Sequence, residues 1–144
     1  MSDITLRVAA KAIIVNESGK VLLLREADTY DEGTNLGKYQ IPGGRLNLGE
    51  SYKEGLCREA KEETGLEIEP LYPIYVGEWH PIIKGEQYQI IAIFTVCKAA
   101  ATDIKLSEEH DDYKWVDPFK LPKNITIPDP EPEVLKRYSD WLKK

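Results

Sequence analysis

The stretch "GGRLNLGESYKEGLCREAKEETGL", residues 43–66, predicts a helix that carries the most unusual cluster of charges in this chain. Within it, Glu59, Glu62 and Glu63 are spaced so that a helix brings three like charges together. Adjacent like charges on an exposed helix repel by roughly 0.2–0.5 kcal/mol per pair, and by more where water is excluded. The three carboxylates destabilise the helix that carries them, so their presence indicates a function other than helix stability.

The boundaries of this helix are marked in the sequence. We expect it to start near Glu50 or Ser51, after the polar turn that follows Gly44. It should end before Gly65, because glycine readily adopts the left-handed conformation of a helix C-cap.

Two of the three carboxylates fall on the wrong side of this helix for a solvated charge run. At about 100° per residue, the arc that faces the protein body holds Tyr52, Leu56 and Ala60. Glu59 and Glu63 fall within this arc or at its edge. The alternative interpretation, a solvated charge run, would place the carboxylates on the outer face among the lysines.

Glu62 lies on the flank of the helix, near Arg58. Partly buried carboxylates need a compensating cation, and one arginine cannot neutralise three of them. A divalent ion can, and carboxylate oxygens are ligands that suit Mg²⁺ or Mn²⁺. The spacing therefore favours a metal site.

The residues around the helix start leave two interpretations open. Gly43 and Gly44 let backbone groups approach a metal or phosphate, or form a tight turn with positive φ, and both can be true. Glu50 either favours the helix dipole or pairs with Arg58. We interpret Arg58 as a positioning cation, because a guanidinium cannot be deprotonated.

The rest of the chain mixes strands with one further helix. A turn is expected at 81–86 and an acidic loop at 105–112. The C-terminal tail predicts an amphipathic helix with Val134, Leu135, Tyr138, Trp141 and Leu142 on its apolar side. Without regular βαβ alternation, this predicts an α+β fold or a mixed-sheet sandwich with two principal helices. The expected strands are 6–15, 21–26, 38–44, 71–80, 87–99 and 113–116.

The composition predicts one domain over residues 1–144, with 42% hydrophobic and 31% charged residues. No apolar run reaches the roughly 20 residues of a membrane helix, and no secretory signal is recognisable. Cys57 and Cys97 are expected to be buried, reduced thiols of a cytoplasmic protein. The net charge of −6 argues against duplex nucleic acid as a partner, but not against a small anion bound through cations.

These residues resemble the signature of the Nudix hydrolases, the MutT-like family. That signature begins with a glycine, then five variable positions, a glutamate and seven further variable positions. It ends with the string Arg-Glu-aliphatic-any-Glu-Glu-any-Gly-aliphatic. Every fixed position is present here, with Ala60 as a small occupant of one aliphatic place. The matching residues are Gly44, Glu50, Arg58, Glu59, Glu62, Glu63, Gly65 and Leu66.

The resemblance implies an α/β/α sandwich around a mixed sheet, and it implies roles for the signature residues. Glu59 and Glu63 would be the principal metal ligands, Glu62 a further ligand, and Gly43 would offer its carbonyl. The signature residues Glu50 and Arg58 would orient this constellation. The implied reaction is hydrolysis of a nucleoside diphosphate linked to another group, with Mg²⁺ or Mn²⁺ as cofactor.

The residue that accepts a proton from the attacking water stays open. In the family this role falls to a signature glutamate or to an acid on a later loop, so Glu62 and Glu63 are the first candidates. Glu109 is the preferred candidate outside the signature, in "SEEHDD". Its neighbour His110 is interpreted as a structural or surface residue.

The signature does not identify the substrate. Pro81 lies near the position where ADP-ribose-cleaving relatives tend to carry a proline, whereas the chain length fits nucleoside triphosphate clean-up equally well. Arg7, Arg25 and Arg45 are candidates for phosphate contacts, and Trp79 for stacking on a base. The alternative function is a nucleotide-binding sensor without hydrolysis, although such relatives typically lose signature glutamates. Exposed strand edges are expected near 87–98, and these would allow a homodimer.

Overall fold

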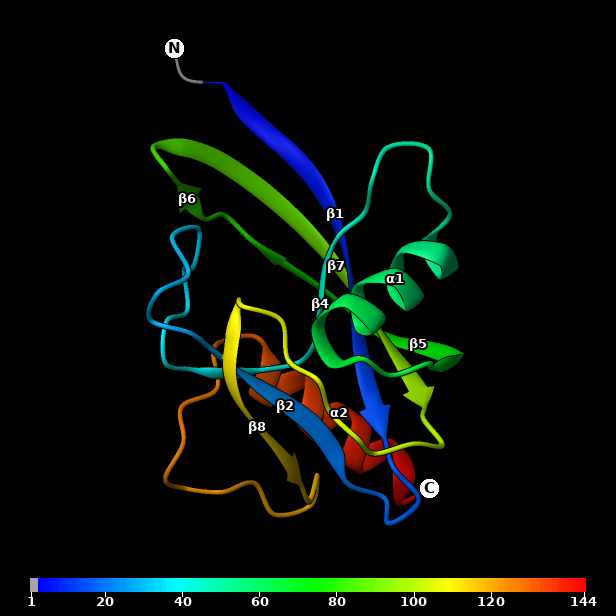
Figure 1. Ribbon diagram of the computed structural model, residues 1–144. Coiled ribbons are helices and arrows are strands. Elements are labelled where there is room, and N and C mark those ends of the chain that lie inside the picture. The colour runs from blue at the N-terminus through cyan, green and yellow to red at the C-terminus, as the bar shows by residue number, and fades with distance from the viewer. Residues whose placement is uncertain (1–2) are drawn as a thin grey trace.

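The computed structural model describes residues 3–144 as a curved mixed sheet with two helices (Figure 1). The strand order is β3-β2-β1-β7-β5, while β4 pairs with β1, β6 with β7 and β8 with β2. The first two residues of the predicted 1–144 domain lie outside the described residues. The elements are β1 (Ile4–Val15), β2 (Val21–Glu26), β3 (Tyr39–Gln40), β4 (Gly43–Arg45), α1 (Tyr52–Thr64), β5 (Glu69–Trp79), β6 (Ile82–Ile83), β7 (Glu86–Lys98), β8 (His110–Val116) and α2 (Glu131–Leu142).

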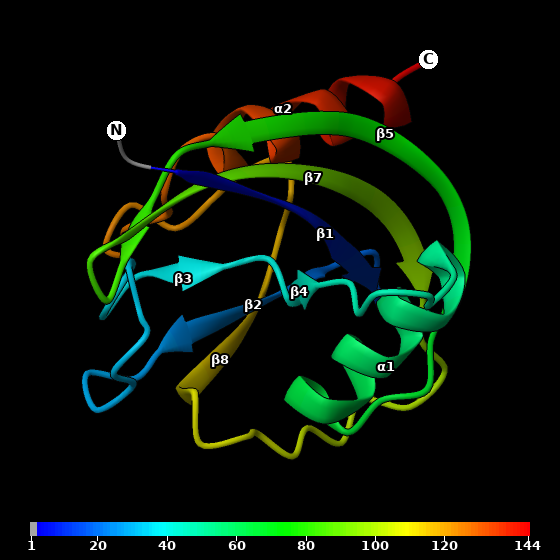
Figure 2. The same ribbon diagram turned by 90° about the horizontal axis from the view of Figure 1, so that it is seen from above.

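The two faces of the sheet have separate cores, and each core is covered by one helix. Alternation along β1 sends Ala9 and Ile13 to one face and Ala12 and Ile14 to the other. The first core includes α2 side chains such as Leu135, and the second includes residues of α1. Figure 2 shows α1 and α2 on opposite sides of the strands. This arrangement, and the solved structures compared below, confirm the α/β/α sandwich.

The strands β1 and β2 diverge, and this divergence makes room for a site. β1 runs parallel to β7 along its whole length, but its register with β2 is Val15 opposite Val21. Between the diverging strands, β3 pairs with β2 and β4 pairs with β1. The segment from Gln40 to Gly43 therefore crosses from one half of the sheet to the other, directly beside α1 (Figure 2).

Helix α1 has the boundaries that the sequence predicted. Ser51 is its N-cap: the Ser51 hydroxyl accepts a hydrogen bond from the Glu54 N–H, and the Glu54 carboxylate accepts one from the Ser51 N–H. Gly65 ends the helix in the left-handed conformation, with φ of 77°. Because both ends are capped, α1 is a rigid mount for the carboxylates that it carries.

Several expectations about the outer strands were wrong. Residues 110–112 of the predicted acidic loop belong to β8, because this segment pairs with β2. The predicted turn at 81–86 contains the short strand β6, which pairs with the start of β7. β7 has no exposed edge at 87–98, because β1 and β5 pair along its two sides.

Two further burial predictions also need correction. The side chain of Cys57 is only half-buried, whereas Cys97 is fully buried, and both thiols are free. On α2, Trp141 is 42% exposed and Leu142 is 40% exposed. Trp141 nevertheless packs against the ring of Tyr72, with 4.8 Å between the ring centroids. Among residues 3–144, no helix is both long enough and apolar enough to span a membrane.

Candidate active site

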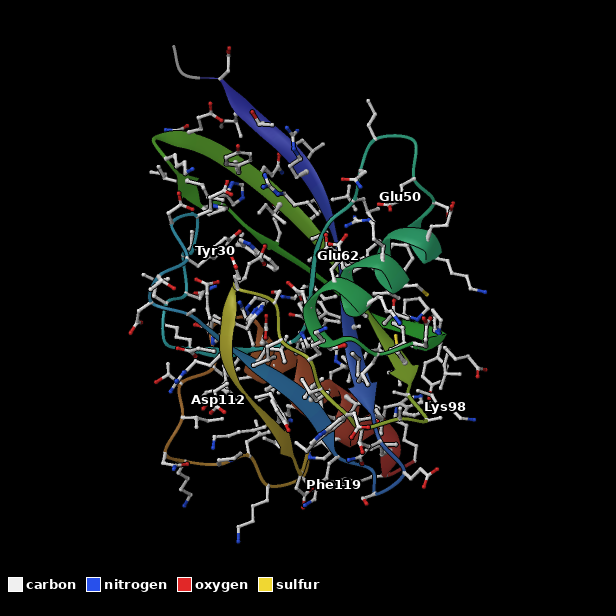
Figure 3. The ribbon with its side chains drawn as sticks, in the orientation of Figure 1. Tyr30, Glu50, Glu62, Lys98, Asp112 and Phe119 are labelled. Carbon is white, nitrogen blue, oxygen red and sulfur yellow. The ribbon has the colours of Figure 1, made fainter. Side chains whose placement is uncertain are left out.

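A cleft of about 420 Å³ opens where β1, β4 and the C-terminal half of α1 meet the turn before β8. Five carboxylates line it: Glu59 and Glu63 from α1, Glu109 from that turn, and Glu26 and Glu32 from β2 and the loop after it. Figure 3 shows Tyr30, another lining residue, on the loop across from α1, where Glu62 is labelled. The cleft therefore brings together signature residues and residues far from the signature.

Glu63 is a buried carboxylate, with 5% of its surface exposed. Its Oε1 accepts a hydrogen bond of 2.8 Å from the Gly43 N–H. Burial raises the pKa of Glu63 well above its ordinary value, and the positive charge of Lys11 only partly opposes this. A carboxylate in this position is costly to ionise unless a cation joins it.

The two glycines before the helix are required for different reasons. A Cβ atom on Gly43 would lie 2.2 Å from the Ala10 carbonyl oxygen, and Gly43 also has φ of 148°. A Cβ atom on Gly44 would instead lie 2.6 Å from Oε2 of Glu59. Gly43 thus lets β4 approach β1, and Gly44 leaves space for a carboxylate at the cleft wall.

Glu109 is held at the cleft by its backbone. Its carbonyl accepts a 2.8 Å hydrogen bond from the Ala27 N–H, which ties the turn to the end of β2. Burial raises the pKa of the Glu109 carboxyl, and the negative charge of Glu59 raises it further. Glu109 is therefore electrostatically coupled to the signature helix, as the preferred candidate outside the signature would have to be.

His110 belongs to the cleft, although the sequence suggested a structural or surface residue. It is buried, and its Nδ1 has no hydrogen-bond partner. One ligand atom each from Glu63, Glu109 and His110 lie within 4.8 Å of one another. Burial lowers the pKa of His110 to about 4, so the ring is neutral at physiological pH and offers a nitrogen lone pair.

The residues present fit a divalent metal ion. The carboxylates of Glu59, Glu63 and Glu109 supply hard oxygen donors in one cleft, which suits Mg²⁺ or Mn²⁺. The unpartnered nitrogen of His110 beside two of them is a buried polar atom that a ligand would satisfy. The raised pKa values of Glu63 and Glu109 also fit a cation site, because their negative charges need a positive partner.

Arg58 forms a second cluster on the same helix. Its Nε donates to Glu50 Oε2 at 2.6 Å, and its Nη1 donates to Glu59 Oε1 at 2.9 Å. Nη1 also pairs with Glu62 at 3.2 Å. The Arg58 hydrogen bond, with one from the Asn47 N–H, lowers the pKa of Glu50 to about 2. The structure thus favours the Glu50–Arg58 pair over the helix-dipole interpretation.

Glu62 does not belong to the cleft lining among the described residues, and its side chain is 57% exposed. It lies on the outer side of Arg58. Its predicted roles as metal ligand and proton acceptor stay predictions.

The sequence analysis missed Lys11 and Glu131. Lys11 of β1 is 7% exposed and lines the cleft, and its Nζ lies 3.5 Å from Glu131 Oε2 of α2. Glu131 is 3% exposed, and its Oε1 accepts a 2.5 Å hydrogen bond from the Ile41 N–H. A lysine in the middle of the apolar run "VAAKAIIV" was the available signal.

The other candidate residues divide between the cleft and its surroundings. Arg7 and Arg45 line the cleft, and their guanidinium carbons lie 5.9 and 5.6 Å from the centre of the Tyr88 ring. Trp79 also lines the cleft. Arg25 does not, since it pairs with Asp111 at 2.6 Å on the outer side of β2 and β8.

Comparisons with known proteins agree with this geometry. A family model described as "NUDIX domain" matches residues 5–138. The "Nucleoside triphosphatase NudI" of Escherichia coli K12 is 35% identical over 116 residues, which cover 75% of this chain and 80% of that protein. A "MutT-like protein" of Streptomyces ambofaciens is 31% identical over 118 residues, which cover 82% of this chain and 68% of that protein.

Solved structures share the whole fold. The crystal structure of a MutT protein from Methanosarcina mazei Go1 has a TM-score of 0.82 and 33% identity, and each chain is covered completely. An ADP-ribose pyrophosphatase from Streptococcus suis has a TM-score of 0.64 and 20% identity, covering 93% of this chain and 91% of that one, which shows the fold alone.

Proposed function

Because this chain belongs to the Nudix family, whose members hydrolyse phosphoric anhydride bonds, we propose that it cleaves nucleoside triphosphates, ordinary or modified, to a nucleoside monophosphate and pyrophosphate. The carrying observation is the cleft in which Glu59, Glu63 and Glu109 converge. The similarity to a nucleoside triphosphatase supports this substrate class over the other substrates of the family. A cleft of about 420 Å³ has room for a nucleotide.

The metal would be held by carboxylate oxygens of Glu59 and Glu63, with the carbonyl of Gly43 as a further donor. A bound Mg²⁺ or Mn²⁺ would neutralise phosphate charge, polarise a phosphoryl oxygen and lower the pKa of a bound water. His110 adds a nitrogen donor at the same place. The protein, which carries a net charge of −6, can then accept an anion because the local charge is reversed.

Arg58 and Glu50 would orient these groups. The guanidinium binds Glu59 on one side and Glu50 on the other, so the helix and the loop before it keep a fixed relation. Displacement at phosphorus depends mainly on alignment and electrostatic stabilisation. A capped helix braced by a bidentate arginine supplies that alignment.

Glu109 is the proton acceptor that we propose. Its carboxyl is half-buried in the cleft, and its raised pKa lies closer to neutral pH, where a general base is effective. Glu63 already uses Oε1 to accept from the Gly43 N–H, and Glu62 is not among the described residues that line the cleft. Arg7, Arg45 and Trp79 would meet the phosphates and base at the cleft mouth.

The test is a nucleotide panel incubated with and without Mg²⁺ or Mn²⁺, with products identified by mass spectrometry. The panel holds the triphosphates, oxidised dGTP, ADP-ribose, dinucleotide polyphosphates and nucleotide sugars. We expect metal-dependent release of a monophosphate and pyrophosphate from a triphosphate. Glu63→Gln should lower turnover by about 10²- to 10⁴-fold, whereas Glu67→Gln, which changes an exposed glutamate just after α1, should leave it unchanged.

Two other results of this panel would support a different function. Turnover confined to ADP-ribose would support the substrate suggested by Pro81, which lines a pocket of about 240 Å³ beside the cleft. Metal-dependent binding of one nucleotide without any turnover would indicate the sensor function instead.

The assembly and location of the chain also stay proposals. We still expect a homodimer, but through β5, which ends the strand order, rather than through β7. A sedimentation measurement of the molecular mass tests this. The expected cytoplasmic location rests on the two free cysteines alone.

A further inference from the structure

We propose that Lys11 binds a phosphate group of the substrate in the cleft, and that Glu131 of α2 positions it. This inference rests on the proposed hydrolysis of nucleotides and adds a residue that lies outside the signature. It connects the catalytic cleft with the C-terminal helix, whose first residue is Glu131.

The burial of Lys11 is the first argument. Its side chain is 9% exposed, and an ammonium group removed from water costs free energy unless it is paired and hydrogen-bonded. The ion pair with Glu131 at 3.5 Å is the one ion pair of Lys11 within residues 3–144. An ammonium has three N–H donors, so this single long contact leaves donor capacity unused.

The position of Lys11 is the second argument. On β1 it lies directly opposite Gly43, the residue whose N–H binds Glu63. It lines both the cleft of about 420 Å³ and the adjoining pocket of about 240 Å³, which also includes Trp79. Lys11 therefore lines the same two cavities as Trp79 and shares the larger one with the carboxylates.

Glu131 holds the Lys11 ammonium in position through one carboxylate oxygen. One carboxylate oxygen of Glu131 accepts from the Ile41 N–H, so the other is directed to Lys11. Ile41 belongs to the segment that crosses from β3 to β4, beside Gly43. Helix α2 therefore contacts the cleft residue Lys11 through the side chain of Glu131. A phosphate group that binds Lys11 would meet an ammonium that is already held in position.

The test measures binding and turnover in four variants: Lys11→Met, Lys11→Arg, Glu131→Gln and the double variant Lys11→Met with Glu131→Gln. Binding of inorganic pyrophosphate is measured by calorimetry with Mg²⁺ present. The matched charge control is Lys98→Met, an exposed lysine at the far end of β7 (Figure 3). The control for Glu131 is Glu133→Gln, which is exposed in the same helical turn.

We expect Lys11→Met to weaken pyrophosphate binding and raise KM by about 10- to 100-fold, the loss of one charge-assisted hydrogen bond, with a smaller change in kcat. Lys11→Arg should restore part of this. Glu131→Gln should raise KM by about 3- to 10-fold with kcat nearly unchanged, since the cation is kept but loosened. Both control variants should behave as wild type.

The double variant separates binding from structure. If Lys11 only neutralised Glu131, removing both charges would restore the wild-type KM and pyrophosphate affinity, and that result would overturn the proposal. We expect the double variant to regain the melting temperature lost in Lys11→Met but to keep the weak binding. Wild-type protein that binds no pyrophosphate would also overturn it, whereas pyrophosphate binding without nucleotide turnover would overturn only the proposed function.

Discussion

Two carboxylate clusters share helix α1, and they differ in the cation that each contains. In the first, Arg58 binds Glu50, Glu59 and Glu62, and the pKa of Glu50 is lowered to about 2. In the second, Glu63 is buried beside Glu109, and the pKa values of both carboxyls are raised by burial. The pKa of Glu50, before α1, and that of Glu63, in its last turn, are therefore shifted in opposite directions, whereas burial raises the pKa of Glu59 despite its bond to Arg58.

The difference shows which part of the helix is complete as folded. In the Arg58 cluster the guanidinium pairs with Glu50 and Glu62, so these two hold geometry, whereas Glu59 also lines the cleft and has its pKa raised by burial. In the Glu63 cluster the ammonium of Lys11 opposes the raised pKa of Glu63, but that ammonium pairs with Glu131. Unsatisfied buried charge is the mark of a site that binds something, because it would otherwise be a pure cost.

The largest expected effect comes from removing the charge of the second cluster. Glu63→Gln should lower kcat by about 10²- to 10⁴-fold without lowering the melting temperature of the metal-free protein. A glutamine can still accept from the Gly43 N–H, and the cost of burying a charge disappears. Steady-state kinetics with Mg²⁺ and thermal denaturation measure the two quantities.

Glu62→Gln is the matched control in the first cluster. We expect a loss below about 10-fold, because Glu62 is 57% exposed and paired with Arg58. A loss as large as that of Glu63→Gln would place Glu62 in the metal site and erase the contrast between the clusters.

A smaller effect is expected from disrupting the first cluster. Arg58→Met should lower kcat/KM by about 10- to 100-fold, since Glu59 and Glu50 lose the group that orients them. The melting temperature should also fall, by about 2–5 °C, because three carboxylates remain together without their cation. Arg58→Lys tests whether charge alone suffices, since lysine cannot reproduce the fork. Wild-type activity in Arg58→Lys would contradict the positioning role.

The last prediction concerns the combined effect of pH and metal on the melting temperature. Because burial raises the folded pKa of Glu63, its proton stabilises the metal-free fold below the ordinary value of 4.5, and this stability is lost as the pH rises through the folded pKa. A metal replaces that proton. The rise in melting temperature caused by Mg²⁺ should therefore be larger near pH 8 than near pH 5.5, by about 3–8 °C.

The same measurement on Glu63→Gln isolates the residue responsible. His110, whose pKa is lowered to about 4, favours the fold as pH rises, but it is present in both proteins and drops out of their difference. An equal Mg²⁺ effect at the two pH values in wild type would show that Glu63 does not exchange its proton for the ion.

The sequence alone determined helix α1 and the signature residues on it. The N-cap at Ser51, the C-cap at Gly65 and the burial of Glu63 follow from interactions within a few residues and from the period of the helix. The pairing of Glu50 with Arg58 was foreseen as one of two interpretations. All of this information is local, so it can be read without knowing what packs against the helix.

Only the tertiary structure decided which residues complete the site. Glu109, which the sequence offered as a candidate, and His110, which it did not, meet Glu63 because β8 pairs with β2, and Lys11 meets Glu131 because α2 packs on the far face of the sheet. These contacts join segments that are distant in sequence, and no local pattern records them. The sequence identified the carboxylates that need a cation, whereas the divergence of β1 from β2 opened the cleft that lets one enter.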